Sequence, residues 1–340
     1  MKNKKKIKIA LDAMGSDLGP SSVIEGAYLA KKKYPNIEYL IFGDKKKVFP
    51  LLEKRNISIN STFVETSQII TNNIKPIDAL RKYKDSSMFK SINSVKCLES
   101  DAVVSGGNTG ALMVISSVLM KTIKGISRPA IASMFPTKKF KTVMLDLGAN
   151  IECNEKNITD FAIMGNVFCK TVLGIKKPKI GLLNVGSEIL KGSNIIRLSA
   201  KNLSLKRNIN FCGFVEGNDI PNGVVDVVVT DGFTGNIALK IAEGTAELYT
   251  EYLKNSFNRN FYSKFAFFIS SPILNFLKKK VNPSKYNGAM FLGLNGIVVK
   301  SHGRSDANGF ANAISVAYDL CKNNFNEKIV YDIKRIINKK

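Results

Sequence analysis

The stretch DAVVSGGNTGALMVISSVLM, residues 101–120, contains the repeating unit of the fold. An apolar run at residues 102–104 stops at the polar, glycine-rich turn 105–110, and a second apolar segment follows at 111–120. A short apolar run without polar alternation is typical of a strand that is buried on both faces. The stretch therefore predicts a buried strand, a tight turn and a helix.

The same unit recurs along the chain. A second long helical pattern covers residues 237–257, where Ile237, Ile241, Leu248 and Tyr252 recur at helical spacing. Repetition of strand, polar turn and helix indicates an open α/β sheet with helices on both faces. Ligands of such sheets bind beyond the carboxyl ends of the strands, so the polar turns form the candidate site. We predict strands at residues 7–11, 39–42, 102–104, 143–145, 180–183, 224–229 and 297–299.

The composition describes a sizeable globular protein. Of 340 residues, 51 are Lys or Arg and 27 are Asp or Glu, which gives a net charge of +24. The counts of 25 Gly and 10 Pro exclude collagen-like and low-complexity chains. Five cysteines without a C-x-x-C pair exclude a disulfide scaffold and favour a reducing cytosol. No apolar segment reaches the ~20 residues that a membrane-spanning helix needs.

The turn 105–110 is the first candidate site. It follows a strand and opens a helix, where free backbone N–H groups and the helix dipole favour an anion such as phosphate or a carboxylate. It matches neither the dinucleotide fingerprint nor the P-loop. The alternative is a tight turn that uses glycine for its geometry alone.

Three further turns carry polar side chains. Lys191 follows the strand at 180–183 and either pairs with phosphate as a point charge or lies in solvent. Asp231, Thr234 and Asn236 surround two glycines, and helix capping by Asp231 or Thr234 is the competing interpretation. His302 is the only histidine, which excludes multi-histidine metal sites.

These turns favour binding and positioning over attack by a protein nucleophile. The chain has no G-x-S-x-G motif, and one histidine leaves little room for a hydrolase triad. The attacking group is then itself a substrate, such as phosphate. Four acidic turn residues offer carboxylates to Mg²⁺, but their spacing defines no ligand set, and we expect no metal: Asp12, Asp17, Asp146 and Asp231.

Taken in order, the turns resemble those of the bacterial phosphate acyltransferase family. Three departures are small, and we expect only local backbone adjustment: Ser16 and Asn287 stand where the family commonly has Gly, and Gly106 where it commonly has Ala. The matching blocks span nearly the whole chain: IALDAMGSD (9–17), VVSGGNTGA (103–111), SRPAIA (127–132), MLDLGANIEC (144–153), GLLNVGSEILKG (181–192), GFVEGNDI (213–220), VVVTDGFTGNIALK (227–240) and YNGAMFLGLNGIVVKSHG (286–303).

The resemblance implies an enzyme that forms acyl-phosphate from acyl-[acyl-carrier-protein] and orthophosphate. It implies a three-layer α/β/α fold with a mixed, mainly parallel sheet, similar to phosphotransacetylase and isocitrate dehydrogenase. Residues 1–340 would form one catalytic unit of two intertwined subdomains, in a homodimer that uses no nicotinamide cofactor. The absent dinucleotide fingerprint agrees with this last expectation.

Roles for the turns follow as hypotheses. The backbone N–H groups of Gly107 to Gly110, with Asn108, Thr109 and Lys191, would hold phosphate. Asn236 or nearby N–H groups would stabilise the oxyanion, and His302 would protonate the departing sulfur or orient phosphate. Further substrate-binding candidates are Asp12, Asp146, Asn150, Asp231, Gly232, Thr234 and Gly235.

Residues 245–287 predict a projecting helical arm. Its aromatic stretch 261–269 precedes Ser271 and Pro272, which we interpret as the N-cap and first residue of a second helix ending at the lysines 278–280. We expect dimer contacts along the stem and contact of the tip with an anionic membrane surface. The product would then reach a membrane glycerol-3-phosphate acyltransferase from a cytoplasmic enzyme on the inner face of the membrane.

The net charge also suits the acidic acyl carrier protein as a partner. Nucleic acid is not expected, because no binding motif for it appears and the lysines are dispersed. Two alternatives stay open: a phosphotransacetylase-like enzyme that uses acyl-CoA, and a non-catalytic membrane-associated scaffold. A metal-dependent dehydrogenase on the same scaffold is a third, weaker alternative.

Overall fold

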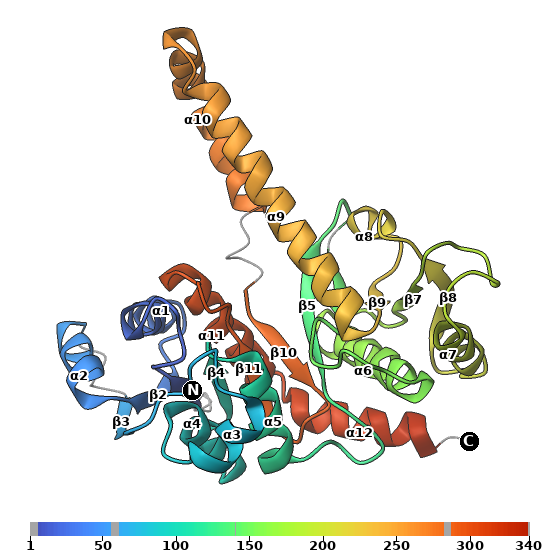
Figure 1. Cartoon of the computed structure of the whole chain (residues 1–340), viewed down its shortest axis with the longest axis horizontal. Coiled ribbons are helices and arrows are strands. Elements are labelled where there is room, and N and C mark those ends of the chain that lie inside the picture. The colour runs from blue at the N-terminus through green and yellow to red at the C-terminus, as the bar shows by residue number, and fades with distance from the viewer. Residues whose placement is uncertain (1–5, 56–60, 140, 282–286, 339–340) are drawn as a thin grey trace, which may run out of the picture.

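The computed structural model describes residues 6–55, 61–139, 141–281 and 287–338. It shows one large sheet with helices on both faces and a helical arm that projects from it (Figure 1). The strands are β1 (Ile7–Asp12), β2 (Ile37–Gly43), β3 (Ser61–Glu65), β4 (Ala102–Ser105), β5 (Ala130–Pro136), β6 (Lys141–Leu145), β7 (Lys179–Leu183), β8 (Asn210–Val215), β9 (Val227–Val229), β10 (Ala289–Leu292) and β11 (Ile297–Lys300). The helices are α1 (Pro20–Lys33), α2 (Lys45–Lys54), α3 (Pro76–Lys82), α4 (Ser87–Lys96), α5 (Thr109–Met120), α6 (Glu155–Val172), α7 (Asn194–Ser204), α8 (Asp219–Asn222), α9 (Gly232–Phe257), α10 (Phe261–Val281), α11 (Ala307–Lys322) and α12 (Phe325–Asn338).

The sheet consists of two parallel groups joined by antiparallel strands. Its order is β3-β2-β1-β4-β11-β10-β5-β6-β9-β7-β8. The pairs β11–β10, β10–β5 and β5–β6 are all antiparallel, so the group from β6 to β8 runs opposite to the group from β3 to β11. The carboxyl ends of the two groups therefore lie at opposite edges of the sheet, so the polar turns predicted as one candidate site form two separate sets.

All seven predicted strands are present, and β9 is shorter than residues 224–229. Four strands escaped prediction. β3 and β8 are sheet-edge strands with half-exposed residues, so they lack a continuous apolar run. β5 and β10 are the central antiparallel strands, and their ends carry no glycine-rich turn into a helix. The predicted unit of strand, turn and helix does not describe them.

The two faces of the sheet carry different helices, which confirms the three-layer α/β/α fold. Ile9 and Leu11 of β1 pack on one face with α1, α2, α6, α7, α11 and α12. Ala10 points to the other face, which carries α3, α4, α5, α8 and α9. Because successive side chains of a strand alternate between faces, one apolar run supplies both cores.

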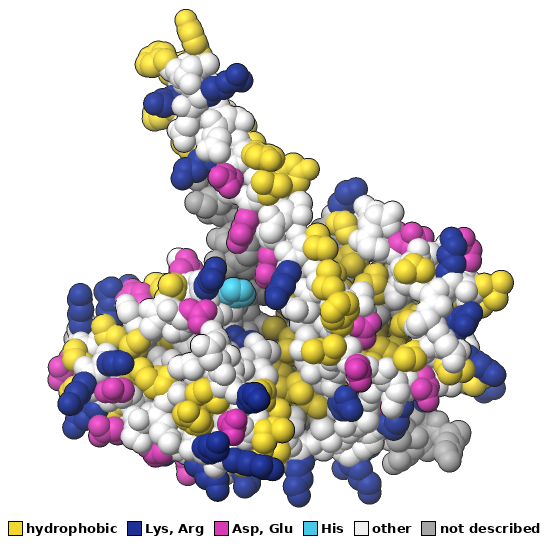
Figure 2. All heavy atoms as spheres, viewed as in Figure 1, with side chains coloured by type: hydrophobic (Ala, Val, Ile, Leu, Met, Phe, Trp, Pro, Cys, Tyr) yellow, Lys and Arg dark blue, Asp and Glu magenta, His cyan; other side chains and the backbone are white. Residues whose placement is uncertain are grey.

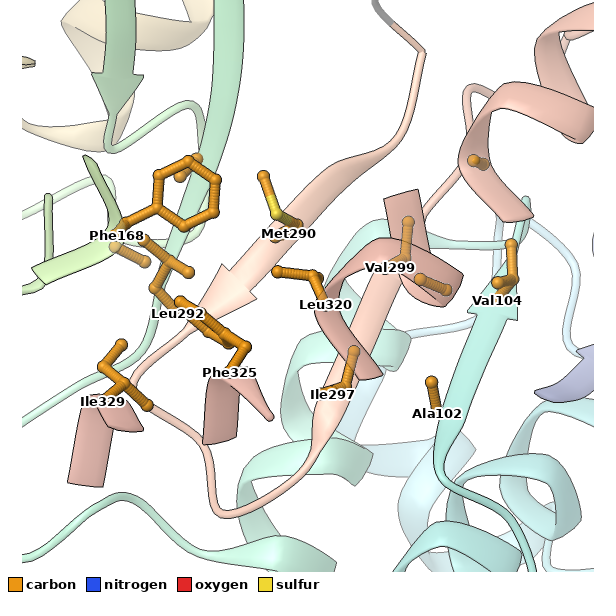
Figure 3. Close-up of a cluster of buried hydrophobic side chains, with 14 of the residues drawn as sticks. Ala102, Val104, Phe168, Met290, Leu292, Ile297, Val299, Leu320, Phe325 and Ile329 are labelled. Atoms are coloured by element: carbon orange, nitrogen blue, oxygen red, sulfur yellow. The ribbon is translucent and has the colours of Figure 1, made fainter. Parts of the chain in front are cut away.

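The first core joins the C-terminal helices to the centre of the sheet (Figure 3). Phe168 of α6 is fully buried, and its ring meets that of Phe325 of α12 edge-on, with centroids 5.7 Å apart. Leu292 of β10 belongs to the same cluster. This cluster therefore holds the antiparallel strands against the helices below them.

The arm consists of α9 and α10 (Figure 1). The prediction that Ser271 and Pro272 begin its second helix is wrong, because α10 begins at Phe261 and Pro272 lies inside it. The start is marked instead by Asn260, whose Oδ1 accepts the backbone N–H of Ser263 at 2.8 Å. Residues 282–286 and the side chains of 278–280 lie outside the described residues. None of the described helices combines the length and apolarity that a membrane crossing requires.

Removing the Phe168 ring tests the core. Phe168→Ala leaves a cavity beside Phe325, and we expect the free energy of unfolding to fall by ~3–5 kcal/mol in denaturant titrations. Tyr331→Ala is the control, because this α12 side chain is 66% exposed; its effect should stay within ~0.5 kcal/mol. Equal losses in both variants would contradict the packing described.

Candidate active site

A buried carboxylate organises the first group of turns. Asp12 at the end of β1 accepts hydrogen bonds from Ser87 Oγ and Ser105 Oγ, both at 2.6 Å. Burial raises the pKa of Asp12, and the two hydroxyls oppose that rise. Asp12 was predicted to bind substrate. The structure shows it joining the start of α4 to the ends of β1 and β4.

Glycine is required where these turns meet. A Cβ on Gly15 would lie 2.7 Å from the backbone nitrogen of Gly107, so no larger residue fits without displacing the loop. A Cβ on Gly106 would lie 3.7 Å from Ser16 Cβ, an ordinary contact. Ser16 and Gly106, two of the small departures from the family pattern, are therefore neighbours. Ser16 has a side chain where the family commonly has Gly, and Gly106 lacks the methyl group of the Ala that the family commonly has.

Asn108 caps α5 and holds its turn in place. Its Oδ1 accepts the N–H of Ala111 at 3.0 Å, and its amide donates to the carbonyls of residues 71, 72 and 74. The N–H of Gly107 donates to Ser105 Oγ at 3.1 Å. Within the described chain, the N–H groups of Thr109 and Gly110 have no acceptor. Two open donors at a helix N-terminus are the arrangement that favours an anion, so this turn stays the candidate anion site, whereas the Asn108 side chain and the Gly107 N–H are occupied.

Lys300 is a residue of this group that the sequence analysis did not select. Its ammonium donates to the carbonyl of Gly106 at 3.0 Å and to that of Ser301, so it connects the end of β11 to the glycine-rich turn. Burial lowers the pKa of Lys300 to about 8, while the carboxylates of Asp17 and Asp12 oppose this shift. Lys300, like Asp12, stands at the end of a buried strand, and this position was the sequence signal that could have identified it.

His302 lies on the exposed turn that follows Lys300. The N–H of Arg304 donates to His302 Nδ1 at 3.2 Å, so in the neutral ring Nε2 carries the hydrogen. The backbone N–H of His302 donates to Asn287 Oδ1 at 2.8 Å. The Asn287 amide donates to Ser301 Oγ, Ser305 Oγ and the Gly309 carbonyl. Asn287, expected to require only local adjustment, therefore holds the histidine turn.

The second group forms around Asp146, after β6. Asp146 Oδ2 accepts the backbone N–H and side-chain amide of Asn150, and its Oδ1 accepts the N–H groups of Ile131 and Ala149. Burial raises the pKa of Asp146 against these hydrogen bonds. The carbonyl of Asn150 accepts the N–H of Gly232 at 2.7 Å, which connects this turn to the start of α9. Asp146 and Asn150, both predicted to bind substrate, therefore hold the turn in its conformation.

Asp231 caps α9, as the alternative interpretation predicted. Its Oδ1 accepts the N–H of Thr234 at 2.8 Å, and its Oδ2 accepts the Thr234 hydroxyl at 2.9 Å. A Cβ on Gly235 would lie 1.9 Å from the Asp146 carbonyl oxygen, and one on Gly232 would lie 2.5 Å from the Asn150 carbonyl oxygen, so both glycines allow close packing.

Asn236 is the polar side chain of this group that stays available. It is half-buried, faces Gly148, and makes no side-chain hydrogen bond within the described chain. Cys153 belongs to the same turn, but burial raises the pKa of its thiol to about 11, so a thiolate nucleophile is not formed there near neutral pH.

Lys191 does not join either group. Its ammonium lies 2.7 Å from Glu188 Oε1 on the exposed loop between β7 and α7, and that partner raises its pKa. Among the described contacts, none connects Lys191 to the anion site at α5. The hypothesis that it helps to hold phosphate therefore has no support from this geometry.

A pocket on one face of the sheet lies beside the second group. α5 and α9 cover the same face, and a pocket of about 630 Å³ separates α5 from the Asp146 turn. Burial raises the pKa of Glu243 on α9, and His302 is close enough to oppose this shift. Figure 2 shows a hollow between the two halves, with the sole histidine near the base of the arm. The pocket is lined by Met113, Ser117, Thr122, Ser127, Arg128, Pro129, Ala149, Asn150, Ile151 and Glu152.

The shifted pKa of Lys300 predicts a stability change with pH. Between pH 8 and the ordinary lysine value of 10.5, the unfolded chain binds a proton that the folded protein has released. Stability from this group therefore rises with pH across that window, by roughly 2–3 kcal/mol. Lys300→Met abolishes the titration, so denaturant titrations should show wild type gaining this amount relative to the variant between pH 8 and 10.5. A difference that does not change with pH would contradict the assignment.

Comparison with known proteins places the chain in a family. Residues 7–328 match the family described as fatty acid synthesis protein. A phosphate acyltransferase from Paramagnetospirillum magneticum is 48% identical over 332 residues, which cover 97% of this chain and 95% of that protein. A phosphate acyltransferase from Rhodospirillum centenum is 51% identical over 330 residues, covering 96% and 93%.

Solved structures show the same fold at low sequence identity. A phosphotransacetylase from Streptococcus pyogenes superposes with a TM-score of 0.64 at 17% identity, covering 93% of this chain and 94% of that one. A branched-chain phosphotransacylase from Enterococcus faecalis gives a TM-score of 0.58 at 12% identity, covering 93% and 99%. The fold similarity and the sequence matches lead to one conclusion. The chain belongs to the fatty acid synthesis protein family and is an enzyme of the phosphate acyltransferase type.

Proposed function

We propose that the enzyme transfers a fatty acyl group from acyl-[acyl-carrier-protein] to orthophosphate. The observation that carries the proposal is the pair of open N–H groups of Thr109 and Gly110 at the start of α5. Backbone donors at a helix N-terminus bind phosphate without a protein nucleophile. The relatives named phosphate acyltransferase support the same reaction.

The reaction needs positioning and charge stabilisation. A phosphate oxygen held at the start of α5 attacks the thioester carbonyl carbon and forms a new C–O bond. The C–S bond then breaks, its electron pair goes to sulfur, and the sulfur takes up a proton. Holding both substrates in one cleft lowers the entropic part of the barrier.

Two side chains suit the remaining steps. The free amide of Asn236 can donate to the oxygen that gains negative charge during attack. The N–H at His302 Nε2 can donate a hydrogen bond to the departing sulfur, because Nδ1 accepts the N–H of Arg304. The proton that the sulfur takes up comes from the O–H of the hydrogenphosphate, which becomes more acidic when its new bond to the acyl carbon forms. Lys191 is left out of these steps, because its ammonium is paired with Glu188 and none of the described contacts brings it to the start of α5.

The donor is assigned from charge. A net charge of +24 favours encounter with the acidic acyl carrier protein. Acyl-CoA is the second candidate, because the fold is shared with phosphotransacetylases. Mass-spectrometric detection of acyl-phosphate from each donor at equal concentration separates the two. Faster turnover of the CoA thioester would overturn the first assignment.

Loss of the imidazole should slow turnover. His302→Ala removes the N–H group that stabilises the negative charge on the departing sulfur, so we expect kcat to fall at least ~10²-fold in the acyl-phosphate assay. Lys47→Ala, which changes an exposed lysine of α2 outside the histidine turn, is the folding-neutral control and should keep wild-type kcat. Wild-type turnover by a folded His302→Ala variant would end the role given to His302.

The arm is proposed to serve two contacts. The exposed apolar face of α9, with Ile237, Ile241, Leu248 and Tyr252, would form the stem of a homodimer. Light scattering that shows a monomer would contradict this.

Hydrophobic side chains gather at the tip of the arm, with basic side chains below them (Figure 2). The tip would bind an anionic membrane surface and pass acyl-phosphate to a membrane acyltransferase, with the enzyme in the cytoplasm.

Charging the tip tests the membrane contact. Phe267 and Phe268 are 50% and 76% exposed on α10. Phe267→Asp with Phe268→Asp should lower co-sedimentation with anionic vesicles at least ~10-fold, because both rings lose their apolar burial. The matched control is Leu205→Asp with Tyr331→Asp, two exposed apolar residues outside the arm. Undiminished binding of the α10 variant would remove the tip from this account.

A further inference from the structure

One face of α5 connects the anion site to the pocket. Thr109, Met113 and Ser117 follow one another at intervals of four residues, so their side chains lie on the same face of the helix. Thr109 begins the helix with an open N–H, whereas Met113 and Ser117 line the pocket. The start of α5 and Ser117 are eight residues apart, which is about 12 Å along the helix, so an extended chain of that length can join them.

The pocket is suited to a chain that carries both apolar and hydrogen-bonding groups. Met113, Pro129 and Ile151 supply apolar surface, and a volume of about 630 Å³ lies within the usual range for ligand sites. The hydroxyl of Ser117 is buried and has no hydrogen-bond partner among the described residues. Its oxygen is shielded from the open pocket, so the donors that an occupant meets are those of the exposed Arg128 guanidinium, which suit amide or phosphate groups and not a hydrocarbon chain.

The far rim of the pocket is basic. The segment 121–128 carries three exposed cations, Lys121, Lys124 and Arg128, and none of them pairs with a carboxylate in the described ion pairs. Arg128 also donates to the carbonyl of Glu152 across the rim at 3.3 Å. Nearby Lys156 is already neutralised by Asp160 at 2.8 Å, and the Glu152 carboxylate is the acidic group in the lining. This rim therefore attracts an acidic or phosphorylated partner.

We infer that the pocket holds the phosphopantetheine arm of the donor thioester, with the acidic carrier protein against segment 121–128. The arm enters past Arg128, passes Ser117 and Met113 along α5, and places its thioester beside Thr109. The acyl chain lies beyond the thioester, outside this pocket. The inference rests on the proposed function, and it adds where the donor binds and which surface receives its protein.

Charge reversal on the rim tests the carrier contact. Lys124→Glu with Arg128→Glu should weaken binding of holo carrier protein ~10-fold, measured by fluorescence anisotropy. KM for the acyl-carrier donor should rise by the same factor. KM for an acyl-N-acetylcysteamine thioester, which lacks both the phosphate and the protein, should stay within about twofold of wild type. Lys45→Glu with Lys46→Glu on α2 makes the same charge change away from the pocket and should alter neither KM.

Filling the pocket tests the arm itself. Met113→Trp should lower kcat/KM at least ~10-fold with both donors and leave the preference for acyl-chain length unchanged, because the arm is common to every donor. Val118→Trp is the control, since Val118 is 54% exposed and absent from the lining. A change in chain-length preference alone would place the acyl chain in the pocket and overturn the inference.

The docking surface and the proposed reaction can be tested separately. Unchanged carrier binding after rim reversal overturns the docking surface, even when acyl-phosphate is formed. Carrier binding that depends on Lys124 and Arg128, without acyl-phosphate from any donor, leaves this surface in place and overturns the proposed reaction.

Discussion

The insertion of two antiparallel strands at the centre of the sheet governs the rest of this molecule. β10 and β5 reverse the chain direction between β11 and β6, so the two parallel groups present their carboxyl ends at opposite edges. A crevice at one edge, the usual site of an open α/β sheet, cannot collect both sets of turns. They are joined instead across one face, where α5 leaves one edge and α9 leaves the other.

Most buried polar groups here hold the site together and do not face the substrate. Asp12 binds Ser87 and Ser105, and Asp146 binds the turn that leads to Asn150. Buried carboxylates are costly without such partners, which explains why each lies among several donors. This arrangement fixes the loops before a ligand arrives, and it leaves the N–H groups of Thr109 and Gly110 and the amide of Asn236 free to act.

Sequence reasoning identified positions more reliably than roles. The polar turns after β1, β4, β6, β9 and β11 were all located, because an apolar run ending at Gly, Asn or Asp is a local signal. Asn108 and Asp231 were placed among ligand contacts, yet their oxygens cap helices. Lys191 was grouped with the phosphate site and lies instead beside Glu188. Lys300 and Asn287 were passed over, because their partners lie on distant segments.

The sequence by itself determined the three-layer class, the seven strands that end at polar turns and the family, since these depend on local periodicity and on blocks kept in register. Only the tertiary structure decided which turns meet. The direction of β5 and β10, the path of α9 back toward His302, and the attachment of Lys300 to Gly106 depend on contacts between residues far apart in the chain. Such contacts leave no local pattern, because the sequence on either side of each contacting residue does not show whether the contact forms.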